Sequence, residues 1–91
     1  MISDEFRERL TLLTEECAEV IQACTKIQRF GLEENPETGE AKIAQLEKEV
    51  GQLNLALNML FAAGDIDRYE VLRNYTLKYT SINEFLNFNE V

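Results

Sequence analysis

The feature that most constrains the fold is a helical spacing of apolar residues that runs through most of the chain. Between residues 6 and 27, apolar side chains recur every three or four positions, which is the period of an α-helix. The same period returns between residues 43 and 61. No stretch alternates apolar and polar residues as a half-buried strand does. The spacing therefore predicts an all-α fold.

Local start and stop signals divide this pattern into three helices. Ser3, followed by two acidic residues, is typical of a helix N-cap, and Gly31 and Gly64 are typical of helix ends. Either Asp65 or Asp67 can cap the third helix. The expected helices cover residues 4–30, 41–63 and 68–86.

The expected core follows from the apolar positions of each helix. In the first helix the apolar stripe is centred on Cys17 and Cys24, which we expect to be buried free thiols. The apolar positions of the second and third helices form similar stripes. Their expected core positions are Ile43, Leu46, Val50, Leu53, Leu57, Leu60, Phe61, Leu72, Tyr75, Tyr79, Ile82 and Leu86.

The length of the chain predicts its organisation. With 91 residues, the chain 1–91 is expected to be one helical domain, and the tail 87–91 is expected to fray. The first two helices form an antiparallel hairpin in this interpretation. Residues 31–40 are an acidic loop, interpreted as a solvated linker, with closure over a ligand as the alternative. Because three thin helices bury little surface, we expect a four-helix-type bundle to form on oligomerisation, as a homodimer or homotetramer.

The composition excludes several classes of function. There is no His and there are only two Cys, which excludes His-dependent catalysis and a tetrahedral zinc site. The net charge of -8 argues against binding to nucleic acid and to anionic membrane surfaces. No apolar run approaches the length of a membrane span, and free thiols suit a reducing compartment, so a cytoplasmic location is expected.

Three carboxylates are the main candidates for a functional site. Glu16 and Glu19 lie one turn apart at the edge of the first helix's apolar stripe, and Glu49 borders the stripe of the second. In an antiparallel hairpin the three can meet. Carboxylates held close together need a counter-charge, and oxygen ligands without His or Cys suit Mg²⁺ or Mn²⁺. The alternative is that they are solvated surface acids, as most helical Glu residues are.

The sequence around these acids resembles the MazG-like all-α nucleotide pyrophosphohydrolases, in particular their short phage and bacterial members. The resemblance covers roughly residues 7–65 and includes the string EECAEVIQA. The matching motifs are Glu15-Glu16-x-x-Glu19, Lys26, Arg29-Phe30-Gly31 and Glu49-Val50-Gly51.

The resemblance implies a hydrolase that converts nucleoside triphosphates to monophosphate and pyrophosphate in the cytoplasm of a bacterial or phage-infected cell. It implies that Glu16, Glu19 and Glu49 are the catalytic residues and the ligands of Mg²⁺, or of Mn²⁺. Basic residues on the helices are then candidates for binding the phosphates, with cations that favour a helix end as the alternative interpretation. These candidates are Lys26, Arg29 and, from the third helix, Lys78.

Two positions depart from the family's pattern. Gln52 stands three residues after Glu49, where the family has an Asp ligand, and Asn58 stands where a further Asp often follows. An amide offers a carbonyl oxygen but lacks the charge that holds a hard cation. One alternative function is therefore a degenerate, non-catalytic member that binds a nucleotide or a protein. Another is a structural helical bundle that only dimerises.

Overall fold

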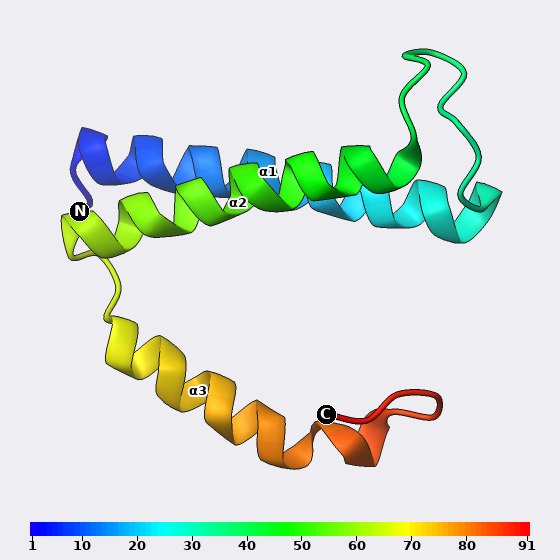
Figure 1. Ribbon diagram of the computed structural model, residues 1–91. Coiled ribbons are helices and arrows are strands. Elements are labelled where there is room, and N and C mark those ends of the chain that lie inside the picture. The colour runs from blue at the N-terminus through cyan, green and yellow to red at the C-terminus, as the bar shows by residue number, and fades with distance from the viewer.

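Two long helices lie side by side and form the packed part of the molecule (Figure 1). The computed structural model describes all 91 residues. Helix α1 spans Asp4–Phe30 and α2 spans Lys42–Ala63, and the two form an antiparallel hairpin. Helix α3 spans Arg68–Ser81 and is followed by a 3-10 helix, η1, over Ile82–Phe85. The structure has no strand, which confirms the all-α fold.

The helix ends follow the local signals in the sequence. The Ser3 hydroxyl accepts a hydrogen bond of 3.1 Å from a backbone N–H of the first turn of α1. Gly31 and Gly64 end α1 and α2 with positive φ angles of 75° and 77°, which a residue without Cβ adopts most readily. Of the two candidate caps for α3, Asp67 accepts from a backbone N–H at 2.7 Å, and Asp65 has another role described below.

The end of the third helix differs from the expectation. Helix α3 stops at Ser81 instead of continuing to residue 86. The hydroxyls of Thr80 and Ser81 donate to backbone carbonyls of the preceding turn, and the chain continues from Ile82 as the 3-10 helix η1. The chain then bends back, and the N–H of Val91 donates to the Asn83 side chain at 3.1 Å.

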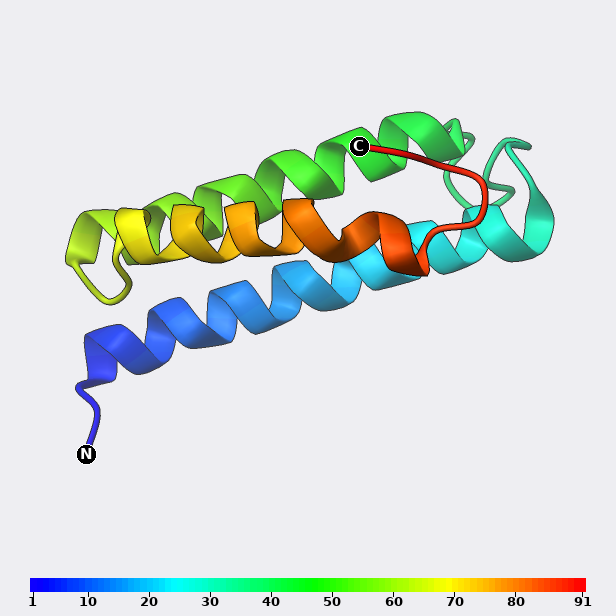
Figure 2. The ribbon, with the colours of Figure 1, turned by 90° about the horizontal axis from the view of Figure 1, so that it is seen from below.

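Helix α3 leaves the hairpin after α2 and runs back below it without packing on it (Figures 1 and 2). None of its residues is buried, and the expected core positions Leu72, Tyr75 and Tyr79 are 59%, 65% and 51% exposed. The expectation that they face inward is wrong for a single chain, because no helix of that chain covers them. The radius of gyration is 16.2 Å, against about 12 Å for a compact chain of this length.

The buried stripe of α1 also differs from the expectation. Only Ala23, Ala56 and Leu60 form the fully buried apolar core of the hairpin. Cys17 and Cys24 are free thiols, as predicted, but both are exposed. Helix α1 has apolar residues on two adjacent faces. Its single neighbour, α2, covers the face of Ala23, so the face of the two thiols stays open.

The buried stripe of α2 contains two charged residues. Lys42 and Glu49 are only 5% and 9% exposed, whereas Ile43 and Val50, two expected core residues, are 45% and 39% exposed. Leu60 is the one large side chain that is fully buried. The part of the hairpin nearest the loop therefore has a polar interior.

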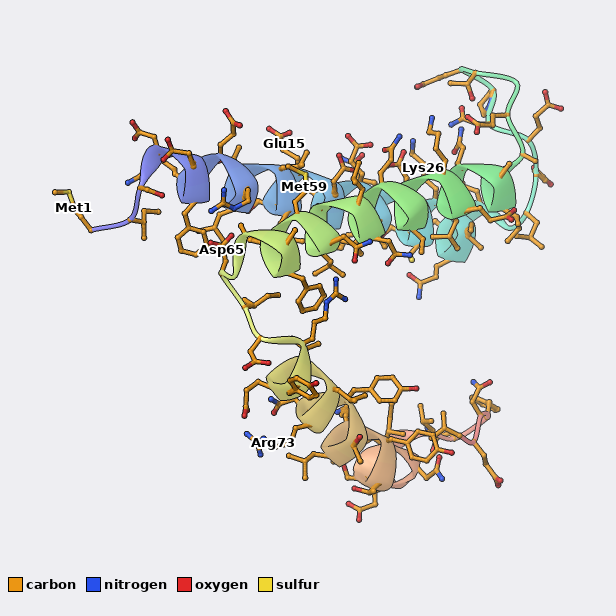
Figure 3. All side chains as sticks on the ribbon, turned by 60° about the vertical axis from the view of Figure 1, so that its left-hand side comes forward. Met1, Glu15, Lys26, Met59, Asp65 and Arg73 are labelled. Carbon is orange, nitrogen blue, oxygen red and sulfur yellow. The ribbon has the colours of Figure 1, made fainter.

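A bidentate ion pair closes the other end of the hairpin. Arg9, in the second turn of α1, donates from Nε to Asp65 Oδ2 at 2.6 Å and from Nη2 to Asp65 Oδ1 at 2.9 Å. The two side chains are 21% and 10% exposed. The hydrogen bonds to Asp65 are the main cause that raises the pKa of Arg9. Figure 3 shows Asp65 at the end of α2, where it anchors the turn that leads to α3.

The substitution Arg9→Gln tests this clasp. Glutamine cannot donate in the forked geometry of a guanidinium, so the partly buried carboxylate of Asp65 loses both of its donors. We expect the melting temperature to fall by several degrees. The matched control Arg7→Gln removes an exposed arginine of α1 with no ion pair and is expected to have little effect; equal losses in the two variants would contradict the assignment.

Candidate functional site

The predicted carboxylates of the two helices meet at the middle of the hairpin. Glu49 of α2 is buried in the helix interface, Glu16 of α1 is half-buried, and Glu19 is exposed one turn further along α1. The amide of Gln52 lies between Glu49 Oε2 and Glu16 Oε2. Its nitrogen and oxygen are assigned from these neighbours: with Nε2 facing the two acids, it donates to Glu49 Oε2 at 3.1 Å and to Glu16 Oε2 at 3.3 Å, whereas the other orientation places an oxygen against two carboxylate oxygens. Glu16, Glu19, Glu49 and Gln52 are called the carboxylate cluster below.

The carboxylate cluster contains more negative charge than the nearby positive charge offsets. Burial is the main cause that raises the pKa of Glu49, and the negative charge of Glu19 is the next. Glu16 adds to the rise, and only Lys48 opposes it. A proton on Glu49 would also allow a hydrogen bond to Glu19. The site therefore favours any group that brings positive charge to Glu49.

The donors suit a hard cation in kind, but the side chains do not surround a common point. Carboxylate oxygens are the ligands that Mg²⁺ and Mn²⁺ prefer. No three Asp, Glu, Cys or His side chains are gathered closely enough to hold a metal ion. Gln52 occupies the space between Glu16 and Glu49 and supplies N–H donors there. Metal binding by this cluster would require the Gln52 amide to present its oxygen, and not its N–H donors, to the space between Glu16 and Glu49.

The three predicted phosphate-binding cations are placed differently. Lys26, labelled in Figure 3, lines a small hollow of about 160 Å³ together with Glu19 and Glu49. Arg29 is exposed, and its guanidinium carbon lies 5.3 Å from the centre of the Phe30 ring. The structure therefore brings Lys26 alone to the cluster.

Lys78 lies on α3, which does not pack against the hairpin. Its Nζ is 5.4 Å from the centre of the Phe85 ring in η1. Within one chain, Lys78 is not brought to the carboxylates.

The loop between α1 and α2 is more ordered than a solvated linker, and Asn35 is the reason. This buried residue accepts from the Glu37 N–H at 2.8 Å through Oδ1 and donates to Gln45 Oε1 at 3.4 Å through Nδ2. Its backbone N–H donates to Glu40 O at 2.9 Å, and its carbonyl accepts from the Gly39 N–H at 2.8 Å. The sequence analysis did not single out Asn35, although Asn before Pro is a known turn signal.

A larger cavity lies at the loop end of the hairpin. Its volume is about 390 Å³, and it lies between Phe30, the loop and Lys42. Lys42 was also missed, because a lysine at the start of a helix gives no sign of burial. The one available signal is its position: as the first residue of α2 it places a cation at the positive end of the helix dipole, which is unfavourable.

Comparison with known proteins finds no matching family model, no matching curated protein and no matching solved structure. None of the helices combines the length and the apolar character that a membrane span needs.

The substitution Glu49→Gln tests the electrostatics of the cluster. It removes a charge whose burial is costly and keeps an oxygen that can accept from Gln52, so we expect the melting temperature in EDTA to rise by a few degrees at pH 7. Since the pKa of Glu49 is raised in the folded state, the parent loses stability as the pH rises above the ordinary value of 4.5. The advantage of the variant is therefore absent at lower pH and grows as the pH rises.

Glu47→Gln, an exposed neighbour on α2, is the matched control and is expected to be nearly neutral. A gain for Glu49→Gln that does not depend on pH would contradict the proposed cause.

Proposed function

We propose that the chain is a Mg²⁺-dependent hydrolase that cleaves nucleoside triphosphates to monophosphate and pyrophosphate in the cytoplasm of a bacterial or phage-infected cell. The observation that supports this most directly is that Glu16 from α1 and Glu49 from α2 both reach the Gln52 amide in the helix interface, with Glu49 buried. An acid in the interface of a small hairpin is costly, and a counter-charge in the working protein would offset that cost. The resemblance of the motif around Glu16 and Glu19 supplies the reaction.

The position of each residue indicates its proposed role in binding the metal ion or the phosphates. Glu16, Glu19 and Glu49 would hold Mg²⁺, or Mn²⁺, which supplies Lewis-acid chemistry and neutralises phosphate charge when bound. Glu19 is exposed and so is the carboxylate most free to move. Lys26 lines the hollow beside it and would donate to a phosphate oxygen as a point charge.

A second candidate function is a non-catalytic nucleotide- or protein-binding bundle, and Gln52 favours it. Its amide donates to one oxygen each of Glu16 and Glu49, the place where the resembling family has a further acid. Two N–H donors stabilise the carboxylates partly as a cation would, so the cluster can persist without metal. The two candidate functions differ in whether Mg²⁺ can replace the Gln52 amide between Glu16 and Glu49.

The exposed surface supports self-association, as a homodimer or homotetramer. The accessible area is 7341 Å², whereas a folded monomer of this mass exposes about 5,400 Å². The excess of roughly 1,900 Å² per chain is of the size that obligate homodimers bury. Large apolar side chains from all three helices contribute to it. Among them are Ile21, Leu55, Leu72 and Tyr75, which are 64%, 60%, 59% and 65% exposed.

A screen of nucleoside and deoxynucleoside triphosphates with pyrophosphate detection tests the hydrolase. We expect release of pyrophosphate in Mg²⁺ and none in EDTA. Glu19→Gln removes a proposed ligand and is expected to lower the rate at least about a hundredfold. Glu8→Gln, an exposed acid three turns earlier on α1, is the control and is expected to keep the parent rate.

Gln52→Asp separates the two candidate functions in the same screen. A weakened enzyme gains Mg²⁺ affinity and rate, because the substitution adds a charged oxygen beside Glu49. Binding of a nucleotide without turnover in either protein supports the non-catalytic candidate. If neither the parent nor the variant binds Mg²⁺, the metal assignment is wrong.

Sedimentation equilibrium tests the assembly. We expect a mass of two or four times 10.5 kDa for the parent. Leu72→Glu places a charge on the apolar face of α3 and is expected to weaken the assembly, whereas Asn74→Glu, on the opposite face, is expected to leave it intact. A parent that remains at 10.5 kDa at all concentrations would refute self-association.

A further inference from the structure

Lys42 is a largely buried residue whose ammonium group has no polar partner. The residue is 5% exposed, and its ammonium group makes no hydrogen bond and no ion pair. The centre of the Phe30 ring lies 5.5 Å from Nζ, and both residues line one cavity. A cation at the start of a helix is unfavourable because it meets the positive end of the helix dipole. An acceptor supplied by a ligand would offset that cost.

The cavity beside Lys42 has the size of a small-molecule site. Its volume of about 390 Å³ lies within the range of roughly 300–1,000 Å³ that such sites occupy. Phe30 and Pro36 offer flat apolar surface, and Lys42 offers donors. The hydrogen bonds of Asn35 hold the loop in place, so this wall of the cavity is formed before any ligand arrives.

The cavity continues toward the carboxylate cluster. Lys26, Asn35 and Glu37 line both the cavity and the adjacent hollow, and the hollow also contains Glu19 and Glu49. The two spaces therefore adjoin, and a ligand that filled both would extend from Glu49 to Lys42. They differ in chemistry, since the hollow has two of the proposed metal ligands and the cavity has an aromatic ring and the ammonium group of Lys42.

The charges around the cavity select against phosphate at the Lys42 end. Glu33, Glu34 and Glu37 line it beside Lys26 and Lys42, so acids outnumber bases. A neutral planar ring avoids that repulsion and can pack against Phe30. The ammonium group only donates and the carboxylates only accept. The complementary ring therefore has a carbonyl for Lys42 and a ring N–H for a carboxylate.

We propose that this cavity binds the base of the nucleotide and selects bases in which a carbonyl adjoins a ring N–H. Uracil, thymine, guanine and hypoxanthine have this pair, whereas adenine and cytosine do not. The inference rests on the proposed function, because it assigns the unreactive end of the same substrate. It places the phosphates at the carboxylate cluster and the base at the loop end of the hairpin.

Binding of uridine and adenosine 5′-monophosphates in EDTA tests the proposal without metal or turnover. Both ligands have the same phosphate, so the ratio of their dissociation constants reports the base. We expect the uridine nucleotide to bind at least about tenfold more tightly, the value of one hydrogen bond to a charged donor. Titration followed by amide NMR shifts is expected to move the resonances of Phe30 and Lys42.

Matched variants locate the effect. Lys42→Met keeps the stem and removes the ammonium group, and it is expected to bring the ratio close to one. Lys48→Met removes a cation from the adjacent hollow and is expected to leave the ratio unchanged. Glu19→Gln is expected to leave it unchanged too, so loss of hydrolysis in that variant is distinguishable from failure of base selection.

Three outcomes would overturn the proposal. These are equal affinities of the parent for the two nucleotides, no saturable binding of either, or a ratio that survives Lys42→Met. If Lys42→Met does not fold, the shifts of the parent decide the matter, because a uridine nucleotide that leaves Phe30 and Lys42 unperturbed does not occupy the cavity.

Discussion

A helix in a two-helix hairpin has a single neighbour, so only one stripe of its side chains can be buried from solvent. This constraint decides most of what is observed here. The side chains buried between α1 and α2 are few and mostly small, such as Ala23 and Ala56, and Leu60 is the one large side chain among them. The remaining apolar stripes, including that of Cys17 and Cys24, are left open. The same constraint leaves α3 without a surface of its own chain to cover it.

Because the interface between the two helices is narrow, each polar group within it has a large effect on stability. Glu49 and Lys42 occupy positions that an apolar residue would fill in a larger core. Gln52 satisfies Glu49 through its amide, whereas Lys42 meets only an aromatic ring. Buried charges of this kind reduce the stability of the isolated chain, and they are intelligible as parts of a site that a ligand completes. The two charges then mark opposite ends of one ligand path.

The sequence was sufficient for features that depend on near neighbours in the chain. Ser3, Gly31 and Gly64 end their helices through local backbone geometry, so the bounds of α1 and α2 were predictable. The face that each helix buries depends on its partner, and the burial predicted for Cys17 and Cys24 was therefore wrong. The end of α3 at Ser81 was missed because the apolar spacing continues to Leu86 through residues that form the 3-10 helix η1.

The site divides in the same way. Glu16 and Glu49 were predictable because acids at the edge of facing stripes meet in any antiparallel hairpin. Lys26 follows Glu19 along α1 and lines a hollow with Glu19 and Glu49. The positions of Lys42 and Asn35 depend on the path of the loop, which the apolar spacing does not describe.

The order in which the contacts of the hairpin form depends on how far apart the contacting residues are in the sequence. The loop end joins residues that are near in sequence, whereas Arg9 and Asp65 are separated by 56 positions, so we expect closure to begin at Asn35 and the clasp to form last. We then expect the clasp to slow the opening of the hairpin and to have little influence on its rate of formation.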